Sequence, residues 1–480
     1  MMERILTVEQ MRAADEFTIS SLGISGEILT ERAAAAVADE IKKRLYGGRV
    51  LVCIGKGNNG EDGKIIAKLL SSAHGFSVAT INVSNGIFKM FDKKYDIIVD
   101  CIFGTGLNRE VYGIYKKAIE KINASGSFVV ACDIPSGLNG NTGKVMGVAV
   151  KANLTVAIQE LKLGHFLNDG PDYCGEVISR DIGISIWGED FVKRLNGEDV
   201  IKCFPERKRN VHKGNFGKVC ILGGSKNFPG SALLSLSGIT ALKLGNGYVN
   251  LAVPDCVYNA CAVLHPECTV TVLPDDGNNL VFDREKIGSL FRYDVIVVGM
   301  GMGVTEENYK IISHIIKNFS GRLVIDADGL NTLSSFGTDV FYQKKCDIVI
   351  TPHIGEFSRL SGEEKNNIIN DSIGYAQRFS EKYGITVVLK SAATVITDGK
   401  ETYLNTTGDA GMAKAGSGDV LSGIIGGMLG KVETETLFAA ASGCYLFGRA
   451  GEYAVKKSNR FCVSATDFSA VLPDVINDLS

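Results

Sequence analysis

The stretch NTTGDAGMAKAGSGDVLSG, residues 405–423, places small residues around Asp419 at the point where an apolar helix is predicted to begin. Glycine lets the main chain approach a ligand closely, and the free N–H groups at a helix start attract an anion. The stretch therefore predicts a binding site for a phosphate of the ATP or ADP type.

Two roles fit Asp419 at this position. An acid is a poor phosphate ligand, but it is well suited to act as a base that takes a proton from an attacking hydroxyl. The alternative is a structural aspartate that caps the helix, because Asp is a favoured N-cap residue. The local pattern leaves both roles open.

Composition limits the classes of protein that need to be considered. A chain of 480 residues is too long for one ordinary hydrophobic core, so we expect two or three domains. Charged residues make up 22% of the chain and the formal net charge is −3, which leaves no global field to attract nucleic acid or an anionic membrane. The 12 cysteines form no CxxC pair and lie mostly in apolar strand-like runs, which predicts reduced core thiols.

The N-terminus, MMERILTVEQ, lacks the apolar region of a signal peptide. No uninterrupted apolar run reaches the roughly 18 residues that a membrane helix needs. We therefore expect a cytoplasmic soluble protein whose partners are small molecules, with neither nucleic acid nor membrane bound. We also expect a homo-oligomer.

Short β-branched runs alternate with longer helical patterns, which predicts parallel βαβ units and an α/β fold class. The predicted strands are 49–54, 77–82, 95–101, 127–132, 153–158, 218–222, 247–253, 294–298, 322–326, 347–350 and 385–390. In the first part of the chain, helices are predicted near residues 62–73 and 112–123. The segment PERKRNVHKGNFG, residues 205–217, is basic and rich in turn residues, so it indicates a solvated connection, with a polyanion site as the alternative. We place two domains at residues 1–205 and 206–480.

Three polar corners follow successive strands of the first domain. They are GKGNNGEDG at 55–63, Asp100 followed by CIFGTGLNRE, and Asp133 followed by IPSG. Ligands of open α/β sheets bind at the carboxyl ends of strands, and Asn58, Asn59 and Asp62 add oxygen atoms suited to a hard cation or to hydroxyls. Each corner by itself also fits an ordinary turn, because Asn, Asp, Gly and Pro are turn residues.

Together with DIPSGLNGNTG at 133–143, these corners resemble the motifs of the NAD(P)H-hydrate epimerase family over roughly residues 1–200. The resemblance implies that a hydrated nicotinamide nucleotide is bound by Asn58, Asn59, Gly60, Glu61, Asp62, Gly104, Thr105, Gly106, Leu107, Asn108 and Arg109. It also implies a potassium ion held by Asn59, Asp100 and Ser136. Weak oxygen donors without clustered carboxylates suit such a large monovalent cation.

By the same resemblance Asp133 faces the substrate, and we take it as the candidate acid or base. One residue departs from the family pattern. The family usually has Gly where this chain has Glu61, and we expect the Glu61 side chain to point to solvent.

The second domain carries four further motifs. They are HKGNFGKVCILGGSKNFPGSALLS at 212–235, VIDADGLN at 324–331, TPHIGEFSRL at 351–360 and VVLKSAATVI at 387–396. Lys390 ends an apolar strand, where it could meet a phosphate or extend from the surface as a solvated lysine. His353 and Glu356 fit a capping pair at a helix start as well as they fit a ligand contact.

With AGSGD, these motifs resemble the ADP-dependent NAD(P)H-hydrate dehydratase family, which has a ribokinase-like fold, over roughly residues 206–480. The residues that the resemblance places at ADP, with two neighbours that we add, are Lys390, Ser391, Ala392, Ala393, Thr394, Gly416, Ser417 and Gly418. Those that it places at the hydrate are Ala232, Gly303, His353 and Asp419. We therefore expect two three-layer α/β/α domains, the first Rossmann-like and the second ribokinase-like.

The order of the two halves resembles the bifunctional NAD(P)H-hydrate repair enzymes. The resemblance implies that the first domain interconverts the R and S epimers of hydrated NADH and NADPH (NADHX and NADPHX). The second would use ADP and Mg²⁺ to convert the S epimer to NAD(P)H, with release of AMP and phosphate. The alternative is a ribokinase-like small-molecule kinase fused to a non-catalytic nucleotide-binding module, and release of phosphate together with NADH separates the two.

Overall fold

The chain divides into two compact units. The computed structural model describes residues 2–86, 88–188, 190–236, 243–262, 266–431 and 433–479. The N-terminal unit comprises residues 4–192, and the C-terminal unit comprises residues 1–3 and 193–480. The boundary expected near residue 205 lies inside the C-terminal unit, because Leu195, Val200 and Cys203 pack in the hydrophobic core of that unit.

The N-terminal unit contains a six-stranded sheet in the order β3-β2-β4-β5-β6-β8, in which all neighbouring strands are parallel. The strands of this unit are β1 (Glu3–Leu6), β2 (Gly48–Ile54), β3 (Phe76–Asn82), β4 (Ile97–Cys101), β5 (Phe128–Cys132), β6 (Leu154–Ile158), β7 (Leu161–Lys162) and β8 (Glu176–Arg180). The chain runs from β2 to one side of the sheet and then, through β4, to the other. Ligands of doubly wound sheets bind where the strand order reverses in this way.

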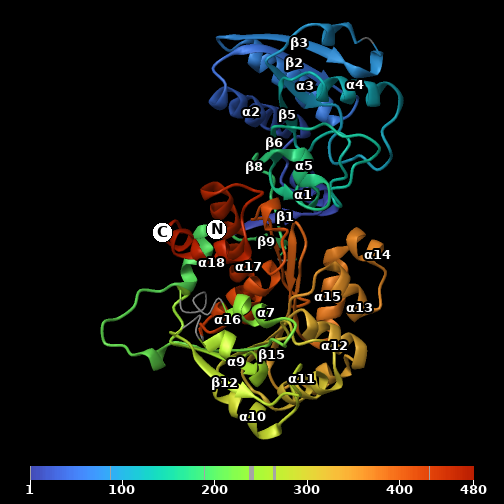
Figure 1. The fold of residues 1–480 in the computed structure, drawn as a ribbon. Coiled ribbons are helices and arrows are strands. Elements are labelled where there is room, and N and C mark those ends of the chain that lie inside the picture. The colour runs from blue at the N-terminus through green and yellow to red at the C-terminus, as the bar shows by residue number, and fades with distance from the viewer. Residues whose placement is uncertain are drawn as a thin grey trace. The chain divides into compact units, whose positions relative to one another are not determined.

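Helices cover both faces of this sheet (Figure 1). The helices are α1 (Val8–Ser20), α2 (Gly26–Arg44), α3 (Asn58–Ser71), α4 (Gly113–Asn123) and α5 (Gly170–Cys174), with the 3-10 turns η1 (Val83–Asn85), η2 (Lys89–Asp92) and η3 (Leu163–His165). Apolar residues of α2 and α3 pack on one face, and those of α4 pack on the other. The predicted three-layer α/β/α architecture of the Rossmann-like type is confirmed.

The sheet of the C-terminal unit runs in the order β12-β11-β10-β13-β14-β15-β16-β17-β18. Its strands are β10 (Lys218–Leu222), β11 (Tyr248–Pro254), β12 (Thr269–Leu273), β13 (Val295–Val298), β14 (Arg322–Ile325), β15 (Asp347–Ile350), β16 (Thr386–Leu389), β17 (Thr394–Thr397) and β18 (Thr402–Asn405), with the short β9 (Val192–Arg194) before them. Strands β17 and β18 form an antiparallel pair, and β17 is also antiparallel to β16. These two strands and β12 were missed from the sequence, because they are short and rich in threonine, and no Gly or Pro marks the turn before β17.

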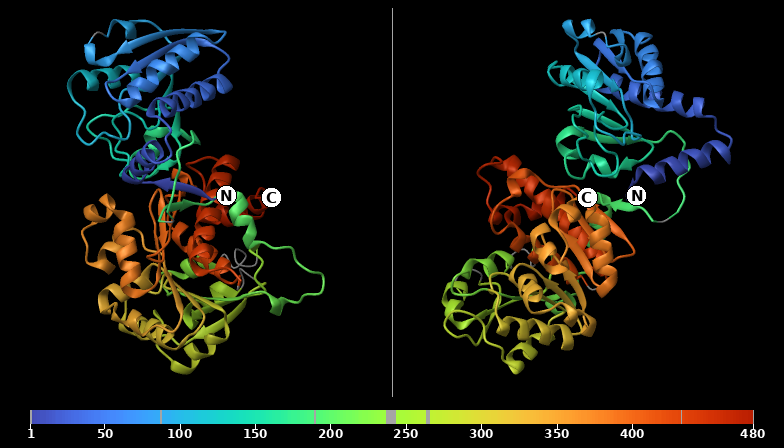
Figure 2. Two further views of the ribbon diagram at one scale, coloured as in Figure 1. Left: turned by 180° about the vertical axis from the view of Figure 1, so that it is seen from behind. Right: turned by 90° about the vertical axis from the view of Figure 1, so that its right-hand side faces the viewer.

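The C-terminal unit is also layered, with α11, α12, α13 and α15 on one side of the sheet and α7, α16 and α17 on the other (Figures 1 and 2). Its helices are α6 (Gly197–Val200), α7 (Pro229–Leu236), α9 (Asp255–Ala262), α10 (Arg284–Gly288), α11 (Glu306–Asn318), α12 (Asp328–Phe336), α13 (Ile354–Ser361), α14 (Lys365–Asn370), α15 (Ser372–Tyr383), α16 (Ser417–Leu429), α17 (Thr436–Lys457), α18 (Ala465–Ala470) and α19 (Leu472–Asn477). Its 3-10 turns are η4 (Ile201–Cys203), η5 (Lys213–Asn215), η6 (Ser289–Arg292), η7 (Asp339–Gln343) and η8 (Ala410–Met412).

Helix α16 is buried along its length, and two of its glycines explain how it fits. A Cβ at Gly423 would lie 2.1 Å from the Ser235 carbonyl oxygen, and one at Gly426 would lie 2.4 Å from a Val297 methyl group. Only glycine permits such close packing against α7 and β13. The start of α16 is therefore held firmly in place by the core behind it.

All 12 cysteines are free thiols, and only Cys256, Cys268 and Cys462 are not buried. The expectation of core thiols is thus confirmed for the buried ones and wrong for the exposed Cys256 and Cys462. Within the described ranges, no helix combines the length and the apolar character needed to cross a bilayer.

Candidate active sites in the two units

The GKGNNGEDG motif is the turn after β2 together with the first turn of α3. The helix begins at Asn58, earlier than the start predicted near residue 62, and Gly57 is its N-cap. Residues three and four apart share one face of a helix. The side chains of Asn58, Glu61 and Asp62 therefore face the same side.

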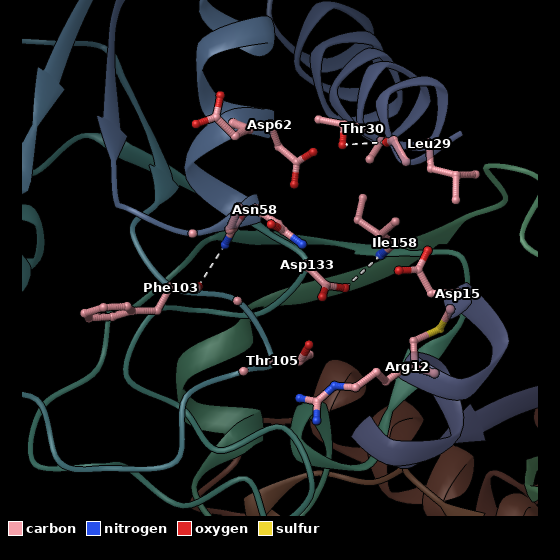
Figure 3. A pocket seen from close by; sticks show the side chains of 18 of the residues that line it. Arg12, Asp15, Leu29, Thr30, Asn58, Asp62, Phe103, Thr105, Asp133 and Ile158 are labelled. Atoms are coloured by element: carbon pink, nitrogen blue, oxygen red, sulfur yellow. Dashed lines mark hydrogen bonds between the residues drawn. The ribbon is translucent and has the colours of Figure 1, made fainter. Parts of the chain in front are cut away.

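That side borders a cavity of about 1030 Å³ in the N-terminal unit, at the point where the strand order reverses. The expected residues that line it are Asn58, Asn59, Glu61, Asp62, Gly104, Thr105, Gly106, Leu107, Asn108, Arg109 and Asp133. Figure 3 shows Asn58 and Asp62 on α3, Arg12 and Asp15 on α1, and Asp133 at the end of β5 around one space. The contribution of α1 was missed, because no local pattern shows where an N-terminal helix will dock.

Glu61 lies at the edge of this cavity and is largely exposed. Its carboxylate forms an ion pair with Lys64 at 2.7 Å, one turn further along α3, and 58% of the side chain is exposed. This position agrees with the expected solvent-facing side chain.

Gly60 does not line the cavity. A Cβ at this position would lie 2.3 Å from the Gly55 carbonyl oxygen, so the glycine is needed for the close approach of α3 to the end of β2. Its expected place in the ligand site therefore gives way to a packing role.

We expect Gly60→Ala to lower the free energy of unfolding of the N-terminal unit by about 1–3 kcal/mol, since a backbone oxygen cannot move aside as a flexible side chain can. Thermal or denaturant unfolding measures this. Gly106→Ala is the matched control, because a Cβ at Gly106 meets nothing within 4 Å. Equal stability of the two variants would contradict the packing role.

A polar cluster lies below the cavity. The Asn59 amide donates to the carbonyl oxygens of Phe103 at 2.8 Å and Cys132 at 3.3 Å. Asp100 is fully buried and accepts from the Ser136 hydroxyl at 2.7 Å and the Ser136 N–H at 2.8 Å. The fold thus brings Asn59, Asp100 and Ser136 together, as the sequence predicted.

One oxygen of this cluster has no partner. Within the part of the chain that the structure describes, the buried Oδ1 of Asn59 accepts no hydrogen bond. Burial raises the pKa of Asp100 to about 6, although Ser136 and Ile102 donate to its carboxylate. An unsatisfied amide oxygen and a buried carboxylate favour a bound cation, which would satisfy both.

Asp133 lies at the end of β5 with a positive φ of 67°, a region that only a few non-glycine residues adopt. Its Oδ1 accepts from the Ile158 N–H at 3.0 Å and from the Lys162 ammonium at 2.5 Å. The sequence reading missed Lys162 and its neighbour His165. A lysine and a histidine inside the apolar run that follows β6 were the available signal.

Asp62 is the second acid of the cavity. Burial, together with the nearby charges of Asp133 and Glu61, raises the pKa of Asp62 to about 7. At neutral pH part of the Asp62 population is protonated, while Asp133 lies beside a cation. The cavity therefore holds both a proton donor and a proton acceptor.

In the C-terminal unit, α16 begins at Ser417, and its N-cap is Gly416 with a left-handed φ of 85° and no side-chain capping bond. Asp419 lies within the first turn, so the N-cap alternative for Asp419 is wrong. Among the described residues, the buried Ser417 hydroxyl finds no hydrogen-bond partner. Uncapped N–H groups and an unpaired hydroxyl form a site suited to a phosphate.

Lys390 lies directly beside this helix start. Its ammonium donates to Asp326 Oδ1 at 2.8 Å, and a Cβ at Gly418 would lie 3.3 Å from its nitrogen. Burial opposes the charge, but Asp326 and Glu356 hold the pKa of Lys390 above its usual value. The alternative of a solvated surface lysine is therefore wrong.

Asp419 shares this charged surrounding. Burial raises the pKa of Asp419 to about 7; the charge of Asp326 adds to the shift, while Lys390 and a hydrogen bond from Ser231 oppose it. A carboxyl group with such a pKa can accept a proton near neutral pH. Ser231 was missed from the sequence, which pointed instead to Ala232.

His353 is the N-cap of α13, which confirms the predicted capping pair with Glu356. Its Nδ1 accepts from the Gly355 and Glu356 N–H groups at 2.9 and 3.2 Å, and Glu356 accepts from the His353 N–H at 2.8 Å. Its backbone also bridges to Lys390. The ring is 54% exposed, so it remains accessible beside the lysine.

The other predicted residues of this unit differ in accessibility. Ala232 has no exposed surface, so its side chain cannot contact a ligand in this conformation. Gly303 has a positive φ of 77°, and its N–H donates to Asp328 at 2.9 Å. Ser391 and Ala392 are exposed in the turn before β17, whereas Ala393 and Thr394 are buried.

Two layered α/β units, one with a polar cavity and one with a phosphate-type helix start beside a lysine and a base, define a two-domain enzyme acting on nucleotides. Residues 219–474 match the family described as NAD(P)H-hydrate dehydratase, and residues 26–90 and 81–164 match the YjeF-related protein N-terminus. The bifunctional NAD(P)H-hydrate repair enzyme of Thermofilum pendens is 32% identical over 99% of this chain and 97% of its own length. The chain belongs to the family of bifunctional NAD(P)H-hydrate repair enzymes.

Two solved structures resemble the C-terminal unit. The ADP/ATP-dependent NAD(P)H-hydrate dehydratase of Bacillus subtilis, co-crystallised with ATP and Mg²⁺, has a TM-score of 0.52 and 26% identity, covering 60% of this chain and 98% of its own. A ribokinase-like superfamily protein of Enterococcus faecalis has a TM-score of 0.50 and 25% identity, with coverages of 60% and 96%. The predicted ribokinase-like fold is thereby confirmed.

Proposed function

We propose that the cavity of the N-terminal unit interconverts the R and S epimers of NADHX and NADPHX, and that the start of α16 carries the ADP-dependent dehydration of the S epimer. Membership of the repair-enzyme family supports both activities. The observation that carries the dehydration site is the position of Asp419 in an uncapped first helical turn beside Lys390.

In the dehydration step, Asp419 takes the proton of the hydrate hydroxyl, whose oxygen attacks the terminal phosphoryl group of ADP and displaces AMP. The phosphorylated ring carbon then expels phosphate with assistance from the lone pair of the ring nitrogen. Loss of a proton from the adjacent ring carbon then forms the ring double bond and restores the dihydronicotinamide. The N–H groups at Gly418 and Asp419 and the ammonium of Lys390 would stabilise the charge on the transferred group.

Mg²⁺ fits this scheme as an ion held mainly by the nucleotide phosphates, which is its usual mode of binding in phosphoryl-transfer sites. It would neutralise phosphate charge beside Lys390. The Bacillus subtilis relative was co-crystallised with ATP and Mg²⁺. We propose that ADP is the phosphoryl donor used by this protein.

In the epimerisation step, the stereocentre carries a hydroxyl next to the ring nitrogen. Reversible ring opening, or loss and return of water, therefore inverts it. Asp133 would move the proton, and Asp62 on α3 lies on the same cavity. Asn58 and the loop Gly104–Arg109 would hold the nucleotide.

Potassium is our proposal for the cluster below this cavity. The unsatisfied Oδ1 of Asn59, the Asp100 carboxylate and the Ser136 hydroxyl fit a large monovalent cation, because all are oxygen donors and only one carries charge. When bound, the ion would supply positive charge at the carboxyl ends of β4 and β5.

We expect epimerisation to fall when K⁺ is replaced by tetramethylammonium, and Asn59→Ala to raise the half-saturating K⁺ concentration by at least about 10-fold. A K⁺ titration of the epimerisation rate and of the melting temperature measures both. Asn85→Ala, an exposed change in the same unit, is the control. Equal K⁺ dependence of Asn59→Ala and wild type would exclude this site.

The proposed function is tested by supplying a mixed-epimer hydrate with ADP and Mg²⁺, and recording both reduced nicotinamide and phosphate. Complete conversion, with one phosphate per NADH formed, is the expected result. Consumption of only one epimer would remove the epimerase activity. A phosphorylated product without NADH would favour the small-molecule kinase.

The cytoplasmic location, the homo-oligomer, and the absence of nucleic-acid and membrane partners remain predictions. Size-exclusion chromatography with light scattering measures the oligomeric state directly.

A further inference from the structure

The backbone at Asp133 is unusual for a residue with a side chain. The Ile134 N–H donates to the Cys132 carbonyl at 2.9 Å, which closes a γ-turn centred on Asp133 with φ of 67°. A turn of this sign is rare and strained. Such conformations persist at functional sites where surrounding contacts fix them.

Residues of β7 and of the following turn η3 supply those contacts. His165 Nδ1 accepts from the Lys162 N–H at 3.1 Å, so the ring proton lies on Nε2, which donates to the Asp133 carbonyl at 2.9 Å. Burial lowers the pKa of His165 to about 4, which keeps the ring neutral. His165 therefore fixes the backbone of Asp133 without adding charge.

Lys162 fixes the side chain. It is 1% exposed, and its ammonium donates to Asp133 Oδ1 at 2.5 Å and to the Ile158 carbonyl at 2.6 Å. The Ile158 N–H also donates to Oδ1, so Oδ2 is the oxygen available to a ligand in the cavity. Separating a buried lysine from its carboxylate partner would leave an uncompensated buried charge, which is strongly unfavourable.

We propose that Lys162 is the positioning residue of the epimerase site, which holds the Asp133 side chain with Oδ2 directed at the substrate, while His165 locks the turn that carries it. This inference rests on the proposed epimerase function. It adds to that function a residue which acts through Asp133 rather than on the substrate.

The other charges around Asp133 make the lysine necessary. Asp62 from α3 interacts with Asp133 as a like charge, and Asp15 from α1 is a further acid on the cavity wall. Arg12 of α1, Lys56 and Arg109 also line the cavity, but Lys162 is the cation with a hydrogen bond to the carboxylate. Without Lys162, the Asp133 carboxylate would lose this hydrogen bond, and repulsion from Asp62 would displace it.

The test measures epimerisation by the full-length protein without ADP, so that dehydration does not occur. We expect Lys162→Met to lower kcat by about 100-fold with KM changed far less, since Asp133 rather than Lys162 touches the substrate. Lys116→Met, at an exposed pair with Glu120, is the matched control and should leave both quantities unchanged.

A second variant keeps the test decisive if Lys162→Met does not fold. Lys162→Ala leaves space for an added alkylammonium ion, and we expect ethylammonium to restore part of the lost kcat in this variant but not in Asp133→Asn. A folded Lys162 variant with the kcat of wild type would overturn the proposal, and so would an Ala variant that no amine restores. If wild type does not interconvert the epimers at all, the proposed epimerase function itself fails.

Discussion

Asp419→Asn is expected to lose ADP-dependent dehydration by about 10²- to 10⁴-fold in kcat while still binding ADP. The amide keeps the size of the side chain in the first turn of α16, but it cannot take the proton of the hydrate hydroxyl. The N–H groups of the helix start and Lys390 remain, so nucleotide binding should persist. Single-turnover kinetics with the S epimer and calorimetric titration with ADP measure the two properties.

The pH profile provides an independent check of the same role. Because the pKa of Asp419 is raised to about 7, the base form is lost as the pH falls through 7, and kcat/KM for dehydration should fall with it. Asp339→Asn, an exposed change in η7, serves as the matched control and should retain the wild-type profile. Near-normal turnover by Asp419→Asn would rule out the base assignment.

Asp133→Asn is expected to lower the rate of epimerisation by about 10²- to 10⁴-fold relative to wild type, while dehydration of purified S epimer continues. Asn tolerates a positive φ better than most residues, so the γ-turn should survive. What is lost is the carboxyl oxygen Oδ2 at the cavity and the hydrogen-bond partner of Lys162. Monitoring the R epimer by chromatography without ADP gives the rate.

Asp172→Asn, an exposed change on α5, controls for the substitution itself. A melting temperature recorded alongside separates the loss of catalysis from the cost of leaving the Lys162 ammonium unpaired. Unchanged epimerisation by a folded Asp133→Asn would remove Asp133 from the mechanism.

Local patterns along the chain were enough to predict the positions of most of the longer strands in both units. Each predicted strand is present, because a β-branched run bounded by turn residues carries its own signal. The antiparallel β17 and β18 were missed because the turn before β17 contains no Gly or Pro, although Asp398 and Gly399 between the two strands were an available turn signal. The start of α3 at Asn58 was placed too late, because its N-cap is a glycine without a side-chain bond.

The candidate site residues were likewise predicted where a local pattern marks them and missed where their role depends on a distant partner. The corners at Asn59, Asp100 and Ser136 were found because strand ends of a parallel sheet meet at one edge, and the structure joins them through hydrogen bonds. Lys162 and Ser231 were missed because each gains meaning only from a partner distant in the chain, Asp133 in one case and Asp419 in the other.

The sequence by itself determined the α/β class, the two halves and the acids at their strand and helix ends, since these depend on local periodicity and on glycine positions. Tertiary structure alone decided that Gly60 serves packing and that Asp133 lies in a strained turn held by Lys162 and His165. It also decided the raised pKa of Asp419. The physical reason is that removal of water and the approach of charges from other elements exist only once the chain has packed.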